Sequence, residues 1–126
     1  MKYVLDSSAW IEYFEGSNIG EKVNKIIESD NEIYVLAVNI GEIISMLKRN
    51  SKDFKTAYES IVKRAKIVDI TPRIAKDSGI LHAEKRMKNS SFSLADSFII
   101  NAAKAIKAKV VTKDLQFKEF EESIII

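Results

Sequence analysis

Short runs of β-branched residues alternate along the chain with longer segments in which apolar residues recur every three or four positions. The short runs predict strands at residues 2–5, 32–35, 67–70 and 109–112, and a fifth at an edge at residues 123–126. The longer segments predict helices at residues 9–14, 19–29, 39–48, 53–64, 72–87 and 94–106. Because this alternation is typical of parallel pairing, we expect an α/β fold with a mainly parallel, four- to five-stranded sheet flanked by helices.

Capping and turn residues divide the chain into these segments. Thr71 can cap a helix whose first position is Pro72, and Ser93 can cap the helix that follows the predicted loop Asn89-Ser90-Ser91. A length of 126 residues, 46% of them hydrophobic, suits one core, and neither a linker nor an internal repeat interrupts it. We therefore treat residues 1–126 as one domain.

The composition excludes several kinds of site. Without cysteine there can be neither a disulfide framework nor a thiolate metal site, and a single histidine supplies zinc poorly. The first apolar run meets Asp6 almost at once, and no run approaches the roughly 20 apolar residues of a membrane span. We expect a cytoplasmic protein that does not enter a membrane.

The net charge of +2 does not by itself indicate a nucleic-acid partner. If four of the 18 acids were gathered in one metal site, the remaining surface would be distinctly more basic and could hold a phosphate backbone. The simpler interpretation of the charge alone is a lysine-rich solvated surface.

Two acids follow predicted strands directly. Asp6 comes after the strand at residues 2–5, and Asp114 comes just after residues 109–112. Ligands of open parallel sheets bind beyond the carboxyl ends of the strands, so both side chains are candidates for a shared site. Aspartate is also a common turn residue, which explains either position taken singly.

Asp96 and Glu42 are candidates of different strength. Asp96 shares a helix face with Ile99 and Ile100, and a carboxylate on an apolar face needs a cation or hydrogen-bond donors. It can also complete a capping box with Ser93, and both roles can hold together. Glu42 lies off the apolar stripe of its helix and alone resembles an ordinary exposed glutamate.

Several carboxylates that converge would repel one another and take up protons unless a cation joined them. Ligand sets made only of oxygen suit Mg²⁺ or Mn²⁺. Two such ions, about 4 Å apart, can stabilise both the attacking and the leaving oxygen of a phosphodiester. The hypothesis from the residues is therefore a metal-dependent hydrolase of phosphodiester bonds.

Four segments in order, VLDSSAWIEYF, NIGEIISML, SLADSFIINAA and VVTKDLQF, resemble the PIN-domain ribonucleases, in particular the VapC-type toxins of toxin–antitoxin pairs. The likeness covers essentially the whole chain. It implies a three-layer PIN-like fold and a Mg²⁺- or Mn²⁺-dependent endoribonuclease that leaves a 5′-phosphate and a 3′-hydroxyl. It also implies that the catalytic, metal-binding residues are the acids Asp6, Glu42, Asp96 and Asp114.

The resemblance extends to supporting residues. Ser8 and Thr112 fall where the family often has a hydroxyl or amide that orients a carboxylate or a metal-bound water. Lys113 is a candidate RNA-phosphate contact, although a solvated loop lysine is an equally good interpretation. Many relatives carry a further acid where this chain has Gln116, which predicts that a second metal is weakly held or arrives only with RNA.

The family also implies partners. These are an RNA substrate, a cognate antitoxin that inserts a segment into the acidic site, and a second copy in a homodimer formed largely through helices of the first half. Two alternatives keep the fold: a non-catalytic module that binds metal or a partner, and a housekeeping RNA-processing nuclease. A third is a phosphotransfer receiver or an aspartate-nucleophile phosphatase, but the phosphatase would want an aspartate where Ser8 stands.

Other aromatic and imidazole groups receive structural roles. Trp10, Tyr13 and Phe14 are interpreted as packing for the first helix, with an exposed subset able to stack on a base. His82 lies outside every motif, so we expect a surface or packing role.

Overall fold

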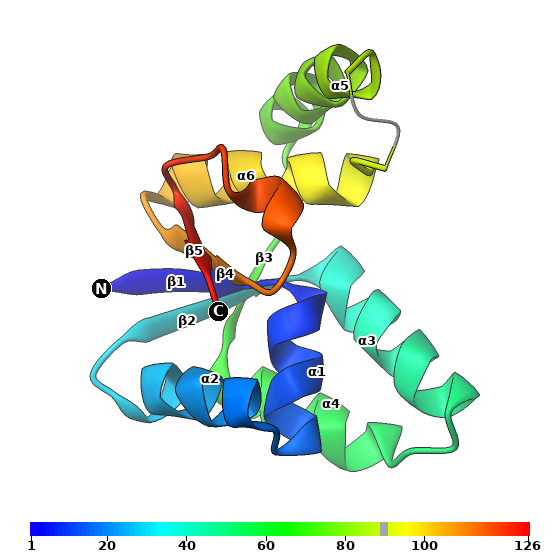
Figure 1. Ribbon diagram of the computed structural model, residues 1–126, viewed down its shortest axis with the longest axis vertical. Helices are drawn as coiled ribbons and strands as arrows, with labels where there is room; N and C mark the ends of the chain where they lie inside the picture. Colours follow the sequence, from blue (N-terminus) through cyan, green and yellow to red (C-terminus); the bar gives the residue numbers. More distant parts are fainter. Residues whose placement is uncertain (89–90) are drawn as a thin grey trace.

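The computed structural model describes residues 1–88 and 91–126 (Figure 1). Of the predicted loop Asn89-Ser90-Ser91, the first two residues lie outside the described residues, and Ser91 is in a turn. Within the described parts of the chain, no helix is both long and apolar enough to cross a membrane.

The centre of the molecule is a parallel sheet of five strands in the order β3-β2-β1-β4-β5. This confirms the predicted α/β class and the edge position of the last strand. The bounds are β1 Lys2–Leu5, β2 Glu32–Leu36, β3 Lys66–Val68, β4 Lys109–Thr112 and β5 Ser123–Ile125. Strand β3 ends two residues earlier than predicted, because its three paired positions are those opposite Tyr34, Val35 and Leu36.

Helices cover both faces of the sheet and complete three layers (Figure 1). One layer holds α1 Ser7–Glu15, α2 Asn18–Glu28, α3 Ala37–Arg49 and α4 Phe54–Arg64. On the other face α6, Leu94–Ile106, lies against the sheet, and α5, Pro72–Arg86, packs on α6. The short 3-10 turn η1, Leu115–Phe117, follows β4.

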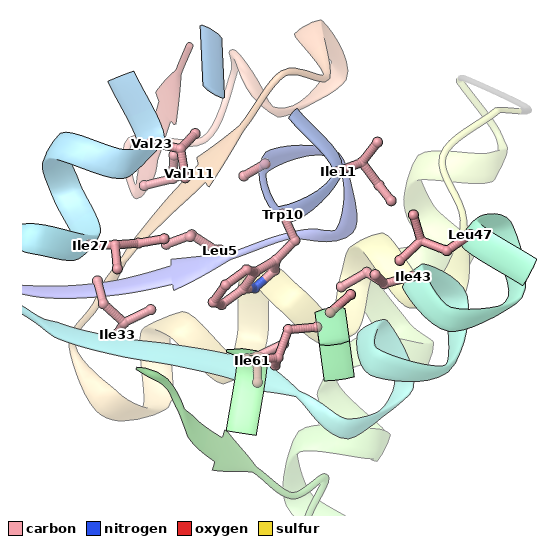
Figure 2. Close-up of a cluster of buried hydrophobic side chains, with 13 residues drawn as sticks. Leu5, Trp10, Ile11, Val23, Ile27, Ile33, Ile43, Leu47, Ile61 and Val111 are labelled. Atoms are coloured by element: carbon pink, nitrogen blue, oxygen red, sulfur yellow. The ribbon is translucent and has the colours of Figure 1, made fainter. Parts of the chain in front are cut away.

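Two hydrophobic clusters fill the space between the layers, because successive strand residues point to opposite faces. Leu5 and Val111 belong to one cluster, whereas Val4 and Val110 belong to the other. Figure 2 shows the first cluster with Trp10 at its centre. Trp10 is fully buried and stacks on Phe14 at 5.9 Å between ring centroids, so its predicted packing role is confirmed.

The topology gathers several chain segments at the carboxyl edge of the sheet. Strand β1 lies between β2 and β4, so the chain leaves it on one side and returns on the other. Helices α1 and α3 begin directly after β1 and β2, and η1 follows β4 (Figure 1). In parallel sheets such a reversal of strand order leaves a crevice where ligands bind.

Candidate functional site

Asp6 ends the central strand and caps α1. Its amide donates to the Val111 carbonyl at 3.2 Å, and its Oδ1 accepts from Ser8 Oγ at 2.7 Å and from the Ala9 amide at 2.9 Å. Oδ2 accepts from Thr112 Oγ1. The residue is only 6% exposed, and this burial raises the pKa of Asp6 above its ordinary value of 3.8 despite the three hydrogen bonds. The nearby charge of Asp96 raises that pKa further.

The hydroxyls beside Asp6 connect it to the loop after β4. Ser8 Oγ accepts from the Lys113 amide at 3.0 Å, and Thr112 Oγ1 accepts from the Asp114 amide at 3.0 Å. Because an amide can only donate, each hydroxyl hydrogen is left to point at the Asp6 carboxylate. Ser8 and Thr112 thus stand where the sequence predicted supporting hydroxyls, and their role in the reaction stays a prediction.

Asp96 both completes a capping box and is partly buried on the inner side of its helix, the two roles that its sequence position predicted. The Ser93 amide donates to Asp96 Oδ2 at 2.9 Å and the Asp96 amide donates to Ser93 Oγ at 3.1 Å, which completes a capping box. The side chain is half-buried, and burial raises the pKa of Asp96 although these hydrogen bonds lower it. The charges of Asp114 and Glu42 raise it further. Asp96 therefore lies within electrostatic range of the other three acids.

Asp114 and Glu42 complete the set of four acids from two other elements, η1 and α3. Asp114 is half-buried and caps η1, accepting from the Gln116 amide at 2.9 Å. Glu42 is exposed, as its place off the apolar stripe indicated, but its Oε1 accepts from Ser7 Oγ at 2.9 Å and from Asn39 Nδ2 at 2.8 Å. Sequence reasoning missed both donors. The spacing of three residues between Asn39 and Glu42 on one helix was the available signal.

The donor chemistry of these acids fits a hard divalent ion. Glu42, Asp96 and Asp114 each keep one carboxylate oxygen that accepts no hydrogen bond from the described residues. In residues 1–88 and 91–126, however, no three acidic or histidine side chains stand close enough to form a ready-made metal cage. The charges of Glu42 and Asp114 disfavour the ionised form of Asp96, and a cation between the carboxylates would remove that repulsion.

Lys113, which precedes Asp114 in the loop after β4, directs its ammonium to Glu12. Its Nζ lies 3.4 Å from Glu12 Oε2, and half of the lysine side chain is exposed whereas the Glu12 side chain is 11% exposed. Ser17 Oγ donates to the other Glu12 oxygen at 3.0 Å. The sequence did not single out Glu12. Its contact with Lys113 joins α1 to the loop that carries Asp114.

The residues from β1 to β5 match the family model of the PIN domain, over residues 3–123. The chain belongs to the PIN-domain family. The resemblance of its four motifs is thereby confirmed, and the match decides against a phosphotransfer receiver or an aspartate-nucleophile phosphatase. The comparison with curated proteins found no match.

Solved PIN-like structures share the fold across nearly the full chain. VapBC2 from Rickettsia felis, bound to a DNA fragment from its promoter, is 18% identical with a TM-score of 0.76, covering 100% of this chain and 98% of that one. A toxin–antitoxin complex from Klebsiella pneumoniae is 18% identical with a TM-score of 0.75, covering 97% and 95%. VapC20 from Mycobacterium tuberculosis, a sarcin–ricin loop cleaving toxin, is 12% identical with a TM-score of 0.74, covering 95% and 97%. At these identities the likeness shows the fold.

Proposed function

We propose that this PIN-domain protein is an endoribonuclease that depends on Mg²⁺ or Mn²⁺. The observation that carries the proposal is that Asp6, Glu42 and Asp114 all lie within electrostatic range of Asp96 at the carboxyl edge of the sheet, and that burial and its acidic neighbours raise the pKa of Asp96. Acids with raised pKa values, here Asp6 and Asp96, at the carboxyl edge of a parallel sheet are typical of a functional site. Ion pairing among these four acids cannot explain why they are grouped, because they carry the same charge.

The four acids would hold the ion through their carboxylate oxygens. When bound, the ion would neutralise the charge that develops as a phosphodiester is hydrolysed. The chain's own residues would act beside it. Ser8 and Thr112 orient the Asp6 carboxylate, and the half-exposed Lys113 side chain, which contacts Glu12 in the free chain, binds an RNA phosphate. The proposed hydrolysis breaks the bond between phosphorus and the 3′ oxygen, which takes a proton, and water supplies the oxygen that stays on the 5′-phosphate.

We further propose that the protein is the toxin of a toxin–antitoxin pair. The similar structure from Klebsiella pneumoniae is a toxin–antitoxin complex, that from Rickettsia felis is VapBC2, and the similar VapC20 is a toxin that cleaves the sarcin–ricin loop. The proposed partners are an antitoxin that covers the acidic site and a second copy of this chain, in the cytoplasm. Pull-down with the product of a neighbouring short gene, and light scattering of the free chain, test these two partners separately.

The central experiment is RNA cleavage by the purified chain with Mg²⁺ or Mn²⁺. Structured RNA should be cut, and Asp96→Asn should lose at least about a hundredfold in rate, since charge-stabilising groups contribute that much. Asp30→Asn is the matched control, because Asp30 is exposed in the turn before β2, at the opposite edge of the sheet. Equal losses in both variants would refute the site assignment.

The chemistry of the products is a second, independent test. New 5′ ends should accept label from a kinase only after phosphatase treatment, because they already carry phosphate. Ends that accept label directly would contradict the proposed direction of hydrolysis. A chain that raises its melting temperature with Mn²⁺ yet cuts no RNA would instead be a non-catalytic metal-binding module.

A further inference from the structure

Asn39 is a buried polar residue in the first turn of α3. It is 1% exposed, and its Nδ2 donates to Glu42 Oε1 at 2.8 Å and to Ser7 Oγ at 3.1 Å. The cap position of this helix, Leu36, offers no side-chain hydrogen bond. Asn39 therefore does not serve as a cap, and instead joins the first turn of α3 to the first turn of α1.

The hydrogen bonds leave the amide of Asn39 only one orientation. Ser7 Oγ donates its hydrogen to Glu42 Oε1, so it can only accept from Asn39. If the amide were turned over, its carbonyl oxygen would face the Glu42 carboxylate. Both donor hydrogens of Asn39 are thus directed at Glu42 and at the hydroxyl that also binds Glu42.

This orientation lowers the stability of the fold in a way that an apolar residue at position 39 would not. Asn39 Oδ1 is buried without a hydrogen-bond partner in the described residues. An unsatisfied buried polar atom destabilises a protein by about 1–3 kcal/mol. Four described side-chain atoms are in this condition, and Asn39 is the one residue among the four whose side chain bonds, within the described residues, to the carboxylate of Asp6, Glu42, Asp96 or Asp114.

We propose that Asn39, assisted by Ser7, is a positioning residue that holds the exposed Glu42 carboxylate ready for a divalent ion. A free glutamate side chain rotates about several bonds, and fixing it when metal binds would cost affinity. Two hydrogen bonds to the same oxygen, Oε1, remove much of that freedom beforehand and leave Oε2 open. The inference rests on the proposed function, because it takes Glu42 to be a metal ligand.

The experiment measures Mn²⁺ binding to the full chain by the paramagnetic resonance signal of free Mn²⁺. Asn39→Ala should weaken binding by about tenfold or more, the usual effect of removing a group that orients a ligand. In a Glu42→Gln background the same substitution should cause no further loss, because Asn39 acts through Glu42. Independent, additive losses would overturn the inference.

A matched control separates positioning from packing. Asn101 is a half-buried amide that donates to Ser78 Oγ at 3.2 Å and to the Ser97 carbonyl at 3.0 Å, between α5 and α6. Asn101→Ala should lower the melting temperature and leave Mn²⁺ affinity unchanged. If Asn101→Ala weakens Mn²⁺ binding as much as Asn39→Ala does, a general loss of stability is enough to weaken metal binding, and the inference is overturned.

Ser7→Ala provides a second variant that does not depend on the fold tolerating a change at Asn39. Ser7 is half-buried at the first position of α1, and its removal deletes one of the two donors to Glu42. Mn²⁺ binding should weaken severalfold. If both Ser7→Ala and Asn39→Ala bind Mn²⁺ with wild-type affinity, the positioning role is overturned and the proposed function stands. If the wild-type chain itself binds no Mn²⁺, both the positioning role and the proposed function are overturned.

Discussion

Thr112→Val tests whether the buried hydroxyl beside Asp6 supports the carboxylate. Valine keeps the shape of threonine and removes two hydrogen bonds, one to Asp6 Oδ2 and one from the Asp114 amide. A hydrogen bond to a charged group contributes about 1.5–3 kcal/mol and a neutral one about 1 kcal/mol. Thr112 is fully buried and Asp6 nearly so, so solvent offers little compensation, and we expect a loss of about 3 kcal/mol.

For a chain of this length, that loss corresponds to a fall of about 10 °C in the melting temperature of the metal-free protein. Calorimetry measures it, and Thr56→Val is the control, because Thr56 makes the same kind of bond to Asp53 on an exposed surface. The control should change little. If the melting temperature of Thr112→Val is as close to that of the wild type as the melting temperature of Thr56→Val is, the Thr112 hydroxyl does not support the Asp6 carboxylate.

Three further predictions concern stability. Burial raises the pKa of Asp96, so the protonated group stabilises the fold fully below the ordinary aspartate pKa of 3.8, and this stability is lost as pH rises through the folded-state pKa. The Asp96→Asn variant should therefore resist urea better than the metal-free wild type at neutral pH, and it should lose this advantage in acid. A methyl group at Gly20 would lie 2.0 Å from the Glu12 carbonyl oxygen, so Gly20→Ala should lower the melting temperature by several degrees, whereas Gly41→Ala, in open space on a helix, should raise it. Trp10→Ala, at a fully buried position, should cost about 3–5 kcal/mol in urea unfolding.

Local signals predicted the elements best where they were strongest. The Thr71 hydroxyl does accept from the Ile74 amide with Pro72 at the first helical position, and Ser93 does cap α6 in a capping box. These caps depend on residues three apart, so a sequence displays them directly. Helix α1 instead begins at Ser7, two residues before the predicted start, because Asp6 is its cap as well as a candidate ligand.

Features that depend on the placement of separate elements could not be predicted. The position of Glu42 rests on Ser7, 35 residues away, and on Asn39, whose burial arises only when α3 packs beside α1. Likewise, Glu12 and Lys113 meet across 101 residues. The strand-end rule predicted the edge at which Asp6 and Asp114 lie, but the hydroxyl pairing around Asp6 requires the register between β1 and β4.

The place of Asp6 in the middle strand gives the acids unequal resistance to local opening. Its amide is bonded across to Val111, so exchange of that hydrogen with solvent should require β1 and β4 to separate, an event close to global unfolding. The half-buried Asp114 caps a single 3-10 turn, and its amide, bonded to the Thr112 hydroxyl and to no other strand, should exchange sooner. An incoming ion or inhibitor would therefore meet Asp6 on a segment that opens only with the sheet, and Asp114 on a segment that opens more readily.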